Sequence, residues 1–242
     1  MKIKITLSYN GAYFQGFAPQ LNKKGVLNHL QIAFASLGIT SKLAGAGRTD
    51  KGVHALSQVV HTDISDVWID KLERLKIELN RKLQHVSVKN ITKTQEEFHA
   101  RFSAKKRVYR YIISSKKLTP FNQDLLTYVS AKNINIDLIT QAIKLYEGEY
   151  NFKFFKKSGS CTKTNTRIIY KARFYKHKDY FVFLFIANGF LRNQVRIMVG
   201  FLLEISKQKL FFEDLHSQLK CIKLYFKKPA PPQGLYLTRI IY

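Results

Sequence analysis

The sequence predicts an α+β protein made of two ferredoxin-like halves, each a split βαβ unit with an antiparallel sheet. Segments that alternate apolar and polar residues indicate strands, and segments with apolar residues at helical spacing indicate amphipathic helices. These segments follow the same order twice along the 242 residues. We therefore expect an N-terminal domain over 1–104 and a C-terminal domain over 105–242.

The first half opens with "KIKITLSY", whose strict alternation indicates a strand. Gly25 and Gly38 then bound a segment with one apolar helical face, and the second glycine suits a helix C-terminus. A glycine-rich loop separates the next two strands. The expected elements are a strand at 2–9, a helix at 25–38, strands at about 41–46 and 55–64, a helix at 68–83 and a strand at 86–93.

The second half repeats this order without obvious residue identity. Lys178 and Asp179 form a turn between two strands, and the Asn188-Gly189 turn precedes a helix. A proline-rich turn at 229–232 leads into the last strand. The expected elements are a strand at 106–114, a helix at 136–147, strands at about 166–177 and 180–187, helices at about 195–205 and 209–220, and a strand at 234–242.

The charge is strongly positive and uneven. The chain has 41 Lys and Arg residues against 16 Asp and Glu, a net charge of +25. Residues 101–242 hold 27 basic and 8 acidic side chains, whereas 1–100 hold 14 and 8. Such an excess is costly through self-repulsion and favours a polyanionic partner. A lysine-rich genome that uses Lys as surface filler accounts for part of it.

Several classes of protein and site are disfavoured. No apolar run approaches the ~20 residues of a spanning helix, and the N-terminus has no signal-peptide core, so we expect a cytoplasmic protein without membrane contact. Cys161 and Cys221 lack metal-ligand spacing and are expected to be free thiols rather than a disulfide. His54, His61 and His99 are expected to be packed residues. Without a Walker loop, a Rossmann fingerprint or Cys/His clusters, we expect no cofactor and no metal.

A basic segment, "GEYNFKFFKKSGSCTKTNT" at 148–166, interleaves lysines with phenylalanines and is expected to be an unstructured loop. Lysines neutralise phosphates and aromatic rings stack on unpaired bases, which favours an RNA contact. The phenylalanines also suit a loop that folds back into the core. Of these, Phe154 and Phe155 are expected to be buried.

The loop "GAGRTDKGVHA", Gly45 to Ala55, contains Asp50, the only acid between Met1 and Thr62. An Asp-x-Gly sequence suits a simple turn between two strands. An isolated carboxylate would repel a polyanion, however, so its presence needs another reason. An aspartate nucleophile acts without a cofactor, and this loop is the one place in the sequence that suggests such chemistry.

Five segments together resemble the TruA family of tRNA pseudouridine synthases, in order from Tyr9 to Tyr242. They are "YNGAYFQGFAPQ" (9–20), "GAGRTDKGVHALSQVVH" (45–61), "FHARFSAKKRVYRYII" (98–113), "GFLRNQVRIMVG" (189–200) and "PPQGLYL" (231–237). The resemblance implies isomerisation of uridine to pseudouridine at positions 38, 39 and 40 of the tRNA anticodon stem-loop by a homodimer. The two halves would then flank a central basic RNA-binding cleft.

The resemblance also implies site residues. Asp50 matches the catalytic aspartate, which would attack the uridine at C1′ or C6. Arg48 matches the arginine that places the flipped nucleotide, and Tyr109 the tyrosine that packs against uracil. Arg196 matches the basic residue that pairs with the catalytic carboxylate. Leu235 matches the apolar residue that lines the pocket.

Each assignment has an ordinary structural alternative. Tyr109 lies in a strand where a tyrosine faces the core, Arg196 suits a phosphate contact or solvent, and Leu235 suits the core. For the whole chain, the alternative is a noncatalytic RNA-binding protein of ferredoxin-like fold. DNA binding is disfavoured because no helix-turn-helix pattern appears.

The sequence departs from the family pattern in three respects. Lys51 stands where alanine is usual, and we expect it to point toward phosphate or solvent and to favour the ionised form of Asp50. Residues 79–91 lack the usual Leu-Pro-x-Asp-Ile turn, which affects the local loop and the dimer edge rather than the chemistry. The chain is also compact, which indicates shortened loops.

Overall fold

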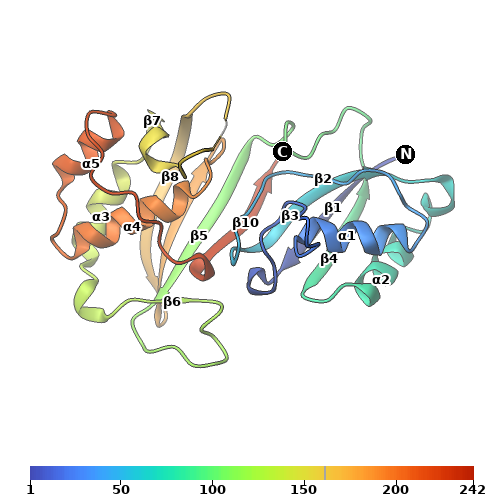
Figure 1. The fold of residues 1–242 in the computed structure, drawn as a ribbon, viewed down its shortest axis with the longest axis horizontal. Helices are drawn as coiled ribbons and strands as arrows, with labels where there is room; N and C mark the ends of the chain where they lie inside the picture. Colours follow the sequence, from blue (N-terminus) through green and yellow to red (C-terminus); the bar gives the residue numbers. More distant parts are fainter. Residues whose placement is uncertain (161) are drawn as a thin grey trace. The chain divides into compact units, whose positions relative to one another are not determined.

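A computed structural model describes residues 1–160 and 162–242 (Figure 1). The chain is a mixed α+β protein, as predicted, and it divides into two compact units. Unit 1 comprises Met1–Lys105 with Tyr236–Tyr242, and unit 2 comprises Lys106–Leu235. The division lies beside the predicted boundary between 104 and 105. The C-terminal strand, however, groups with unit 1 rather than with the second half, because it pairs with a strand of unit 1.

Unit 1 follows the element order β-α-β-β-α-β and adds the C-terminal strand. Its sheet has the order β4-β1-β3, and both β2 and β10 pair with β3. The pairings are antiparallel, except that β10 runs parallel to β3. The elements are β1 Lys2–Tyr9, α1 Val26–Ala35, β2 Ala44–Gly45, β3 His54–Asp63, α2 Leu72–Lys82, β4 Val86–Lys93 and β10 Leu235–Ile241, with 3-10 turns at Gly11–Tyr13 and Asp66–Trp68.

The core of unit 1 lies between one face of this sheet and helices α1 and α2 (Figure 1). Ile3, Ile5 and Leu7, the inward residues of β1, are fully buried. Leu30 of α1 and Leu75 of α2 are also fully buried. The alternation of β1 and the spacing of both helices therefore place the apolar residues as the sequence predicts.

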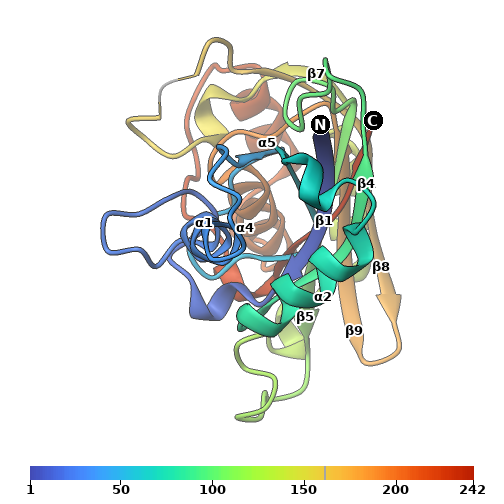
Figure 2. The same ribbon diagram turned by 90° about the vertical axis from the view of Figure 1, so that its right-hand side faces the viewer.

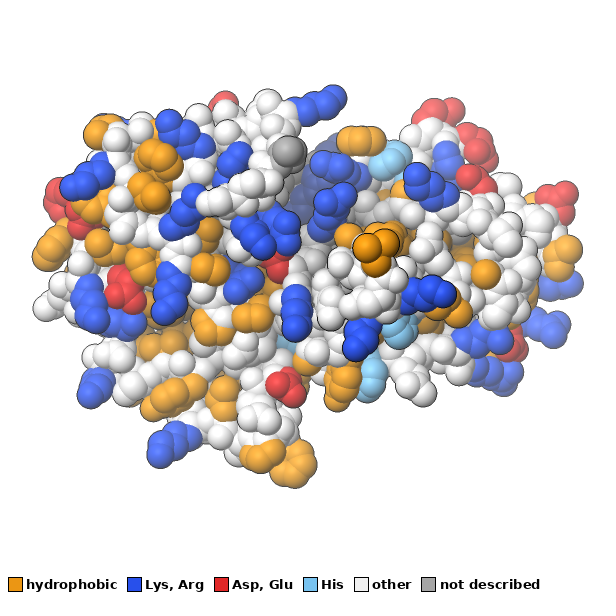
Figure 3. All heavy atoms as spheres, viewed as in Figure 1, with side chains coloured by type: hydrophobic (Ala, Val, Ile, Leu, Met, Phe, Trp, Pro, Cys, Tyr) orange, Lys and Arg blue, Asp and Glu red, His pale blue; other side chains and the backbone are white. Residues whose placement is uncertain are grey.

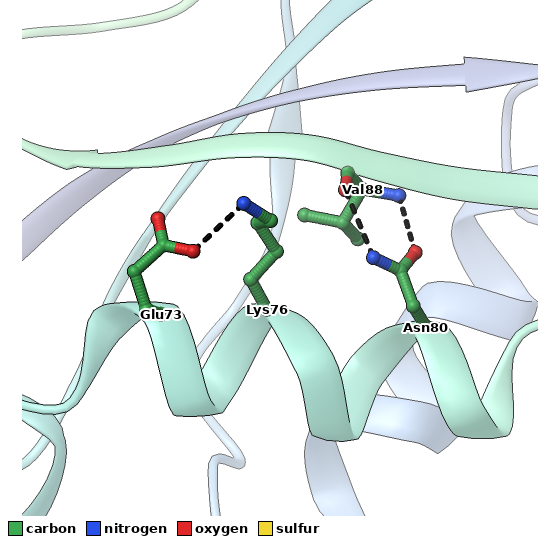
Figure 4. Close-up of polar contacts among 4 residues, drawn as sticks. All are labelled: Glu73, Lys76, Asn80 and Val88. Carbon is green, nitrogen blue, oxygen red and sulfur yellow. Dashed lines mark hydrogen bonds and ion pairs between the residues drawn. The ribbon is translucent and has the colours of Figure 1, made fainter.

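The start of α2 differs from the prediction for a tertiary reason. The expected helix at 68–83 starts only at Leu72, because Trp68 lies in a separate 3-10 turn and its indole N–H donates to the carbonyl of Leu37 at 3.2 Å. In the last turn of α2, the side chain of Asn80 accepts from the N–H of Val88 in β4 at 2.7 Å and donates to its carbonyl at 3.0 Å (Figure 4). This pair fixes the stretch that lacks the family's proline turn.

Unit 2 contains a sheet of order β5-β9-β8-β7, antiparallel throughout, with short β6 parallel to β5. Helices α3 and α4 pack on one of its faces, where Tyr111, Phe183 and Phe185 are fully buried. The β8–β9 hairpin ends in an exposed turn (Figure 2) at Lys178, which has φ 53°. The elements are β5 Lys106–Ser114, β6 Thr127–Tyr128, α3 Ile136–Lys144, β7 Gly148–Asn151, β8 Thr166–His177, β9 Tyr180–Ala187, α4 Gln194–Ser206 and α5 Phe212–Leu219.

The basic segment at 148–166 is not the unstructured loop that the sequence suggested. Its first residues form β7, which pairs with β8, and Phe152–Phe155 form a 3-10 helix. Phe152 and Phe155 are fully buried and pack on each other, and Phe155 also packs against Tyr146, while Phe154 is half-buried. The burial of Phe155 is therefore confirmed, whereas Phe154 is less buried than expected. The prediction of an unstructured loop is wrong for residues 148–155, because these rings anchor them to the core, while residues 156–160 and 162–165 form no helix or strand, as expected.

The remaining expectations concern membranes, thiols and histidines. Within the described part of the chain, no helix is both long enough and apolar enough to cross a bilayer. Cys221 is a free thiol, and Cys161 lies outside the described residues. His61 is packed as expected and accepts the N–H of Ala100 on Nδ1 at 3.1 Å. Among the residues described, no three His, Cys, Asp or Glu side chains are grouped to hold a metal ion.

Candidate active site

The loop that carries Asp50 connects β2 to β3 in unit 1 and is tightly folded. Arg48 is exposed, Thr49 is buried and Asp50 is half-buried. The N–H of Val53 donates to the carbonyl of Asp50 at 3.1 Å, and Gly52 has φ 78°, so the segment closes as a turn that requires glycine. The loop is therefore a turn, and it also presents a carboxylate from a fixed position.

A second segment, residues 9–20, is hydrogen-bonded to this loop from the side of β1. The N–H of Phe17 donates to the carbonyl of Thr49 at 3.1 Å, and the hydroxyl groups of Tyr9 and Thr49 lie 2.8 Å apart. The N–H of Gly11 donates to Nδ1 of His54 at 3.0 Å. Segments 9–20 and 45–55, far apart in the sequence, therefore form one hydrogen-bonded body.

Glycines permit this close approach. A Cβ on Gly11 would lie 2.2 Å from the carbonyl oxygen of Val53, and one on Gly16 would lie 2.8 Å from the carbonyl oxygen of Thr49. Both distances are shorter than any real Cβ contact with backbone. Gly16 also has φ 98°, which side-chain-bearing residues rarely adopt. Each of these glycines is thus needed where the two segments touch.

Tyr109 and Tyr111 lie on the same face of β5 in unit 2, but in different surroundings. Tyr111 is fully buried, and its hydroxyl lies 2.7 Å from Oγ1 of Thr127 and donates to the carbonyl of Pro231 at 2.8 Å. Tyr109 is half-buried, with its ring edge-on to Phe190 at 5.2 Å. The core role therefore belongs to Tyr111, and Tyr109 is the tyrosine with solvent-facing surface.

Arg196 is held in the first turn of α4. Its Nε donates to the carbonyl of Ala230 at 2.7 Å, and one terminal nitrogen donates to the side chain of Asn193 at 3.3 Å. Burial raises the pKa of the nearby Tyr111 hydroxyl, while the hydrogen bond from Thr127 and the positive charge of Arg196 oppose that rise. The guanidinium of Arg196 is therefore fixed in direction rather than loose in solvent.

Leu235 begins β10 and is buried, with 5% of its surface exposed. The preceding residue, Gly234, leaves no room for a side chain, since a Cβ there would lie 2.8 Å from the ring of Tyr111. Leu235 thus sits where the chain is tightly packed.

The five expected site residues come from both units. Asp50 and Arg48 belong to the loop of unit 1, whereas Tyr109, Arg196 and Leu235 belong to unit 2. Lysines and arginines are widely spread over the face of the molecule in Figure 3, and acids are sparse there.

Sequence reasoning missed the polar side chains beneath the Asp50 loop. Gln58 is fully buried, and its amide donates to the carbonyl of Gly47 at 3.0 Å. Thr49 and Gln58 both hydrogen-bond to the hydroxyl of Tyr9. A glutamine directly before the apolar Val59 and Val60 of β3 was the available signal, because buried polar residues require partners.

Comparison with known proteins places the chain in a family. The sequence model of a family described as tRNA pseudouridine synthase matches residues 142–242. tRNA pseudouridine synthase A of Campylobacter jejuni is 41% identical over 100% of both chains. The chain belongs to the tRNA pseudouridine synthase A family.

Other members of the family match at similar length. The proteins of the same name from Helicobacter hepaticus and Helicobacter pylori are 39% and 37% identical, each over 99% of this chain and 98% of their own. A chain of a crystallised Cbf5-Nop10-Gar1 complex has a TM-score of 0.39 and 11% identity, covering 97% of this chain and 48% of that chain, which is too distant to bear on fold or function. The predicted resemblance to the family is confirmed by the curated relatives.

Proposed function

We propose that this chain isomerises uridine to pseudouridine at positions 38, 39 and 40 of the tRNA anticodon stem-loop, with Asp50 as the nucleophile. Membership of the family makes the chain a tRNA pseudouridine synthase, an isomerase. The assignment of Asp50 is supported by one observation: its half-buried carboxylate lies on a loop held by close contact with residues 9–20, in a chain with a net charge of +25. Such a carboxylate weakens the attraction for phosphate, so a chemical role explains it better than binding does.

The reaction requires the target base to leave the helical stem, which costs a few kcal/mol of stacking and pairing. Asp50 then attacks the nucleotide at C1′ or C6, and the bond between N1 and C1′ breaks. The detached uracil rotates and forms a new bond from C5 to C1′. The proton on C5 is released, N1 gains a proton, and the departure of Asp50 restores the carboxylate. No cofactor enters this balance.

The other residues hold the nucleotide for this step. Arg48 is exposed beside Asp50 and would help to place the flipped nucleotide. Tyr109 would lay its ring against uracil, since its edge-on contact with Phe190 fixes the ring's orientation. Arg196 has five N–H donors, two of which bond to Ala230 and Asn193, and we assign others to the carboxylate of Asp50. Leu235 would give the uracil an apolar contact.

The finer organisation is part of the same proposal. The order β-α-β-β-α-β in unit 1, with strand order β4-β1-β3-β2, supports a ferredoxin-like half. We further propose that the chain works as a homodimer in the cytoplasm, where one tRNA would contact two basic surfaces, and that the two halves flank a basic cleft for RNA.

Tritium release separates this proposal from a noncatalytic RNA-binding protein. The substrate is tRNA labelled with tritium at C5 of uridine, because isomerisation discharges that atom to water. We expect release by the wild-type protein with multiple turnovers. Tight binding of tRNA without any release would contradict the enzyme assignment and favour the noncatalytic alternative.

Position specificity needs a separate substrate set. Three anticodon stem-loops, each with one labelled uridine at position 38, 39 or 40, should each release tritium. A fourth, labelled only at a uridine elsewhere in the stem, is the control and should release none. Release confined to the fourth would overturn the position assignment while leaving the isomerase activity intact.

A further inference from the structure

A buried hydrogen-bond network lies directly under the Asp50 loop in unit 1. Tyr9, Thr49 and Gln58 are 5%, 7% and 0% exposed. The hydroxyl of Tyr9 lies 2.8 Å from Oγ1 of Thr49, and Gln58 also bonds to that hydroxyl. Gln58 donates to the carbonyl of Gly47 at 3.0 Å and accepts from the N–H of Val59 at 3.1 Å. The network thus joins β1, β3 and the loop.

The network is polar where the neighbouring inward positions are apolar. Ile3, Ile5 and Leu7 precede Tyr9 on the inward face of β1, and all three are fully buried. An apolar residue in place of a buried hydroxyl or amide avoids the penalty of leaving water. The hydroxyl of Tyr9 therefore needs an explanation. On the inward face of β1 it is the position where the strand reaches the Asp50 loop.

We propose that Tyr9, Thr49 and Gln58 are positioning residues that hold the Asp50 loop in its reactive geometry. Gly47 and Thr49 flank Arg48, and Thr49 directly precedes Asp50. The network therefore holds the loop at two points on either side of Arg48. A carboxylate must be held to a fraction of an ångström, since a shift of ~1 Å costs about 10²-fold in rate. The inference rests on the proposed role of Asp50.

Tyr9 acts here through position rather than by proton transfer. Burial raises the pKa of its hydroxyl well above the ordinary value, and the hydrogen bonds from Thr49 and Gln58 only partly oppose that rise. The hydroxyl is therefore neutral at neutral pH. Its ring is also enclosed by Phe14 and Phe17, at 6.3 and 6.2 Å between centroids.

The first test compares two Tyr→Phe variants in wild-type background, using tritium release from tRNA. Tyr9→Phe should lower kcat at least tenfold, with KM within about twofold and tRNA affinity unchanged. Tyr146→Phe is the matched control, because Tyr146 is fully buried in unit 2 and its hydroxyl donates to the carbonyl of Met198 at 3.1 Å. It should lose comparable thermal stability and keep kcat within twofold. Equal kcat in the two variants would overturn the proposal.

Variants of Thr49 test whether its hydroxyl is the group that matters and whether it acts together with Tyr9. Thr49→Ser keeps the hydroxyl and should retain kcat within about threefold. Thr49→Val loses the hydroxyl, and its kcat should fall as much as that of Tyr9→Phe. Both changes break the bond between Tyr9 and Thr49, and Tyr9→Phe also removes the bond to Gln58. The double variant Tyr9→Phe with Thr49→Val should therefore be no slower than the slower single variant. If the fold-loss in kcat of the double variant equals the product of the two single losses, the two residues do not act through a shared bond.

The outcomes also separate this inference from the assignment of the nucleophile. If Asp50→Asn still releases tritium, the nucleophile is wrong and the network loses its proposed purpose. If Asp50→Asn is inactive while Tyr9→Phe keeps full kcat, only the positioning role fails. Loss in both, with Tyr146→Phe unaffected, supports both.

Discussion

Gly11→Ala is predicted to disable the protein by moving the Asp50 loop. Gly11 lies in the segment 9–20 that packs against this loop, and its N–H donates to Nδ1 of His54 at 3.0 Å. The added Cβ would lie 2.2 Å from the carbonyl oxygen of Val53 and 2.4 Å from its carbonyl carbon. These are backbone atoms, so the clash is not relieved by a side-chain rotation.

The required displacement follows from these distances. Ordinary van der Waals contact begins at 3.4 Å, so the Cβ and the oxygen must separate by about 1.2 Å, the difference between 3.4 and 2.2 Å. Val53 is hydrogen-bonded to the carbonyl of Asp50, so the shift is passed to the carboxylate. A misplacement of this size costs about 10²-fold in rate, and overpacking costs about 1–3 kcal/mol of stability.

The assay is single-turnover tritium release with saturating enzyme, well below the melting temperature of each variant. Gly47→Ala is the control in the same loop, because a Cβ there meets nothing within 4 Å. We expect about 100-fold slower release for Gly11→Ala and a rate within threefold of wild type for Gly47→Ala. A Gly11→Ala rate near that of wild type would refute the reasoning, as would equal losses in the two variants.

Three further predictions concern the core, pH and salt. Phe155→Ala should cost about 3–5 kcal/mol in denaturant unfolding and Phe154→Ala much less, because only Phe155 is fully buried; equal costs would contradict its core role. Burial, and after it the charge of His99, lowers the pKa of His61 in the folded protein. The unfolded chain therefore takes up the proton first, and stability should fall as the pH drops below 6.5 toward the lowered pKa of His61. His61→Asn should flatten this pH dependence of the melting temperature, and an unchanged slope would contradict the role of His61. The logarithm of tRNA affinity should fall linearly with the logarithm of salt concentration, with a slope steeper than about −3, since each phosphate contact contributes roughly −0.7 to −0.9; a flat response would argue against phosphate binding.

Much of the fold follows from local pattern, and the differences arise where distant residues decide. The alternation of 2–9 produced β1 with its bounds intact, because one face of that strand is buried. The start of α2 was not predictable, because the bond from Trp68 to Leu37 spans 31 residues. The segment at 148–166 was misjudged because its lysines suggested solvent, while pairing of β7 with β8 and burial of Phe155 gave it structure.

The candidate site shows the same division. Asp50 stood out because it is an isolated acid in a basic chain, and the motif around it is specific. Tyr109 and Tyr111 were not separable by alternation, since residues two apart share a face of a strand. The network of Tyr9 with Thr49 spans 40 residues, so no local pattern reveals it.

The central claim is that Asp50 is the carboxylate that attacks uridine, and Asp50→Asn tests it most directly. Tritium release should fall by at least 10⁴-fold, while tRNA affinity stays within about threefold of wild type and the melting temperature is preserved. Asp70→Asn is the control, because Asp70 is an exposed acid of unit 1 whose ion pair with Lys93 is a surface contact of little energetic weight. It should release tritium at the wild-type rate. Release by Asp50→Asn at a rate comparable to that of Asp70→Asn would contradict the account.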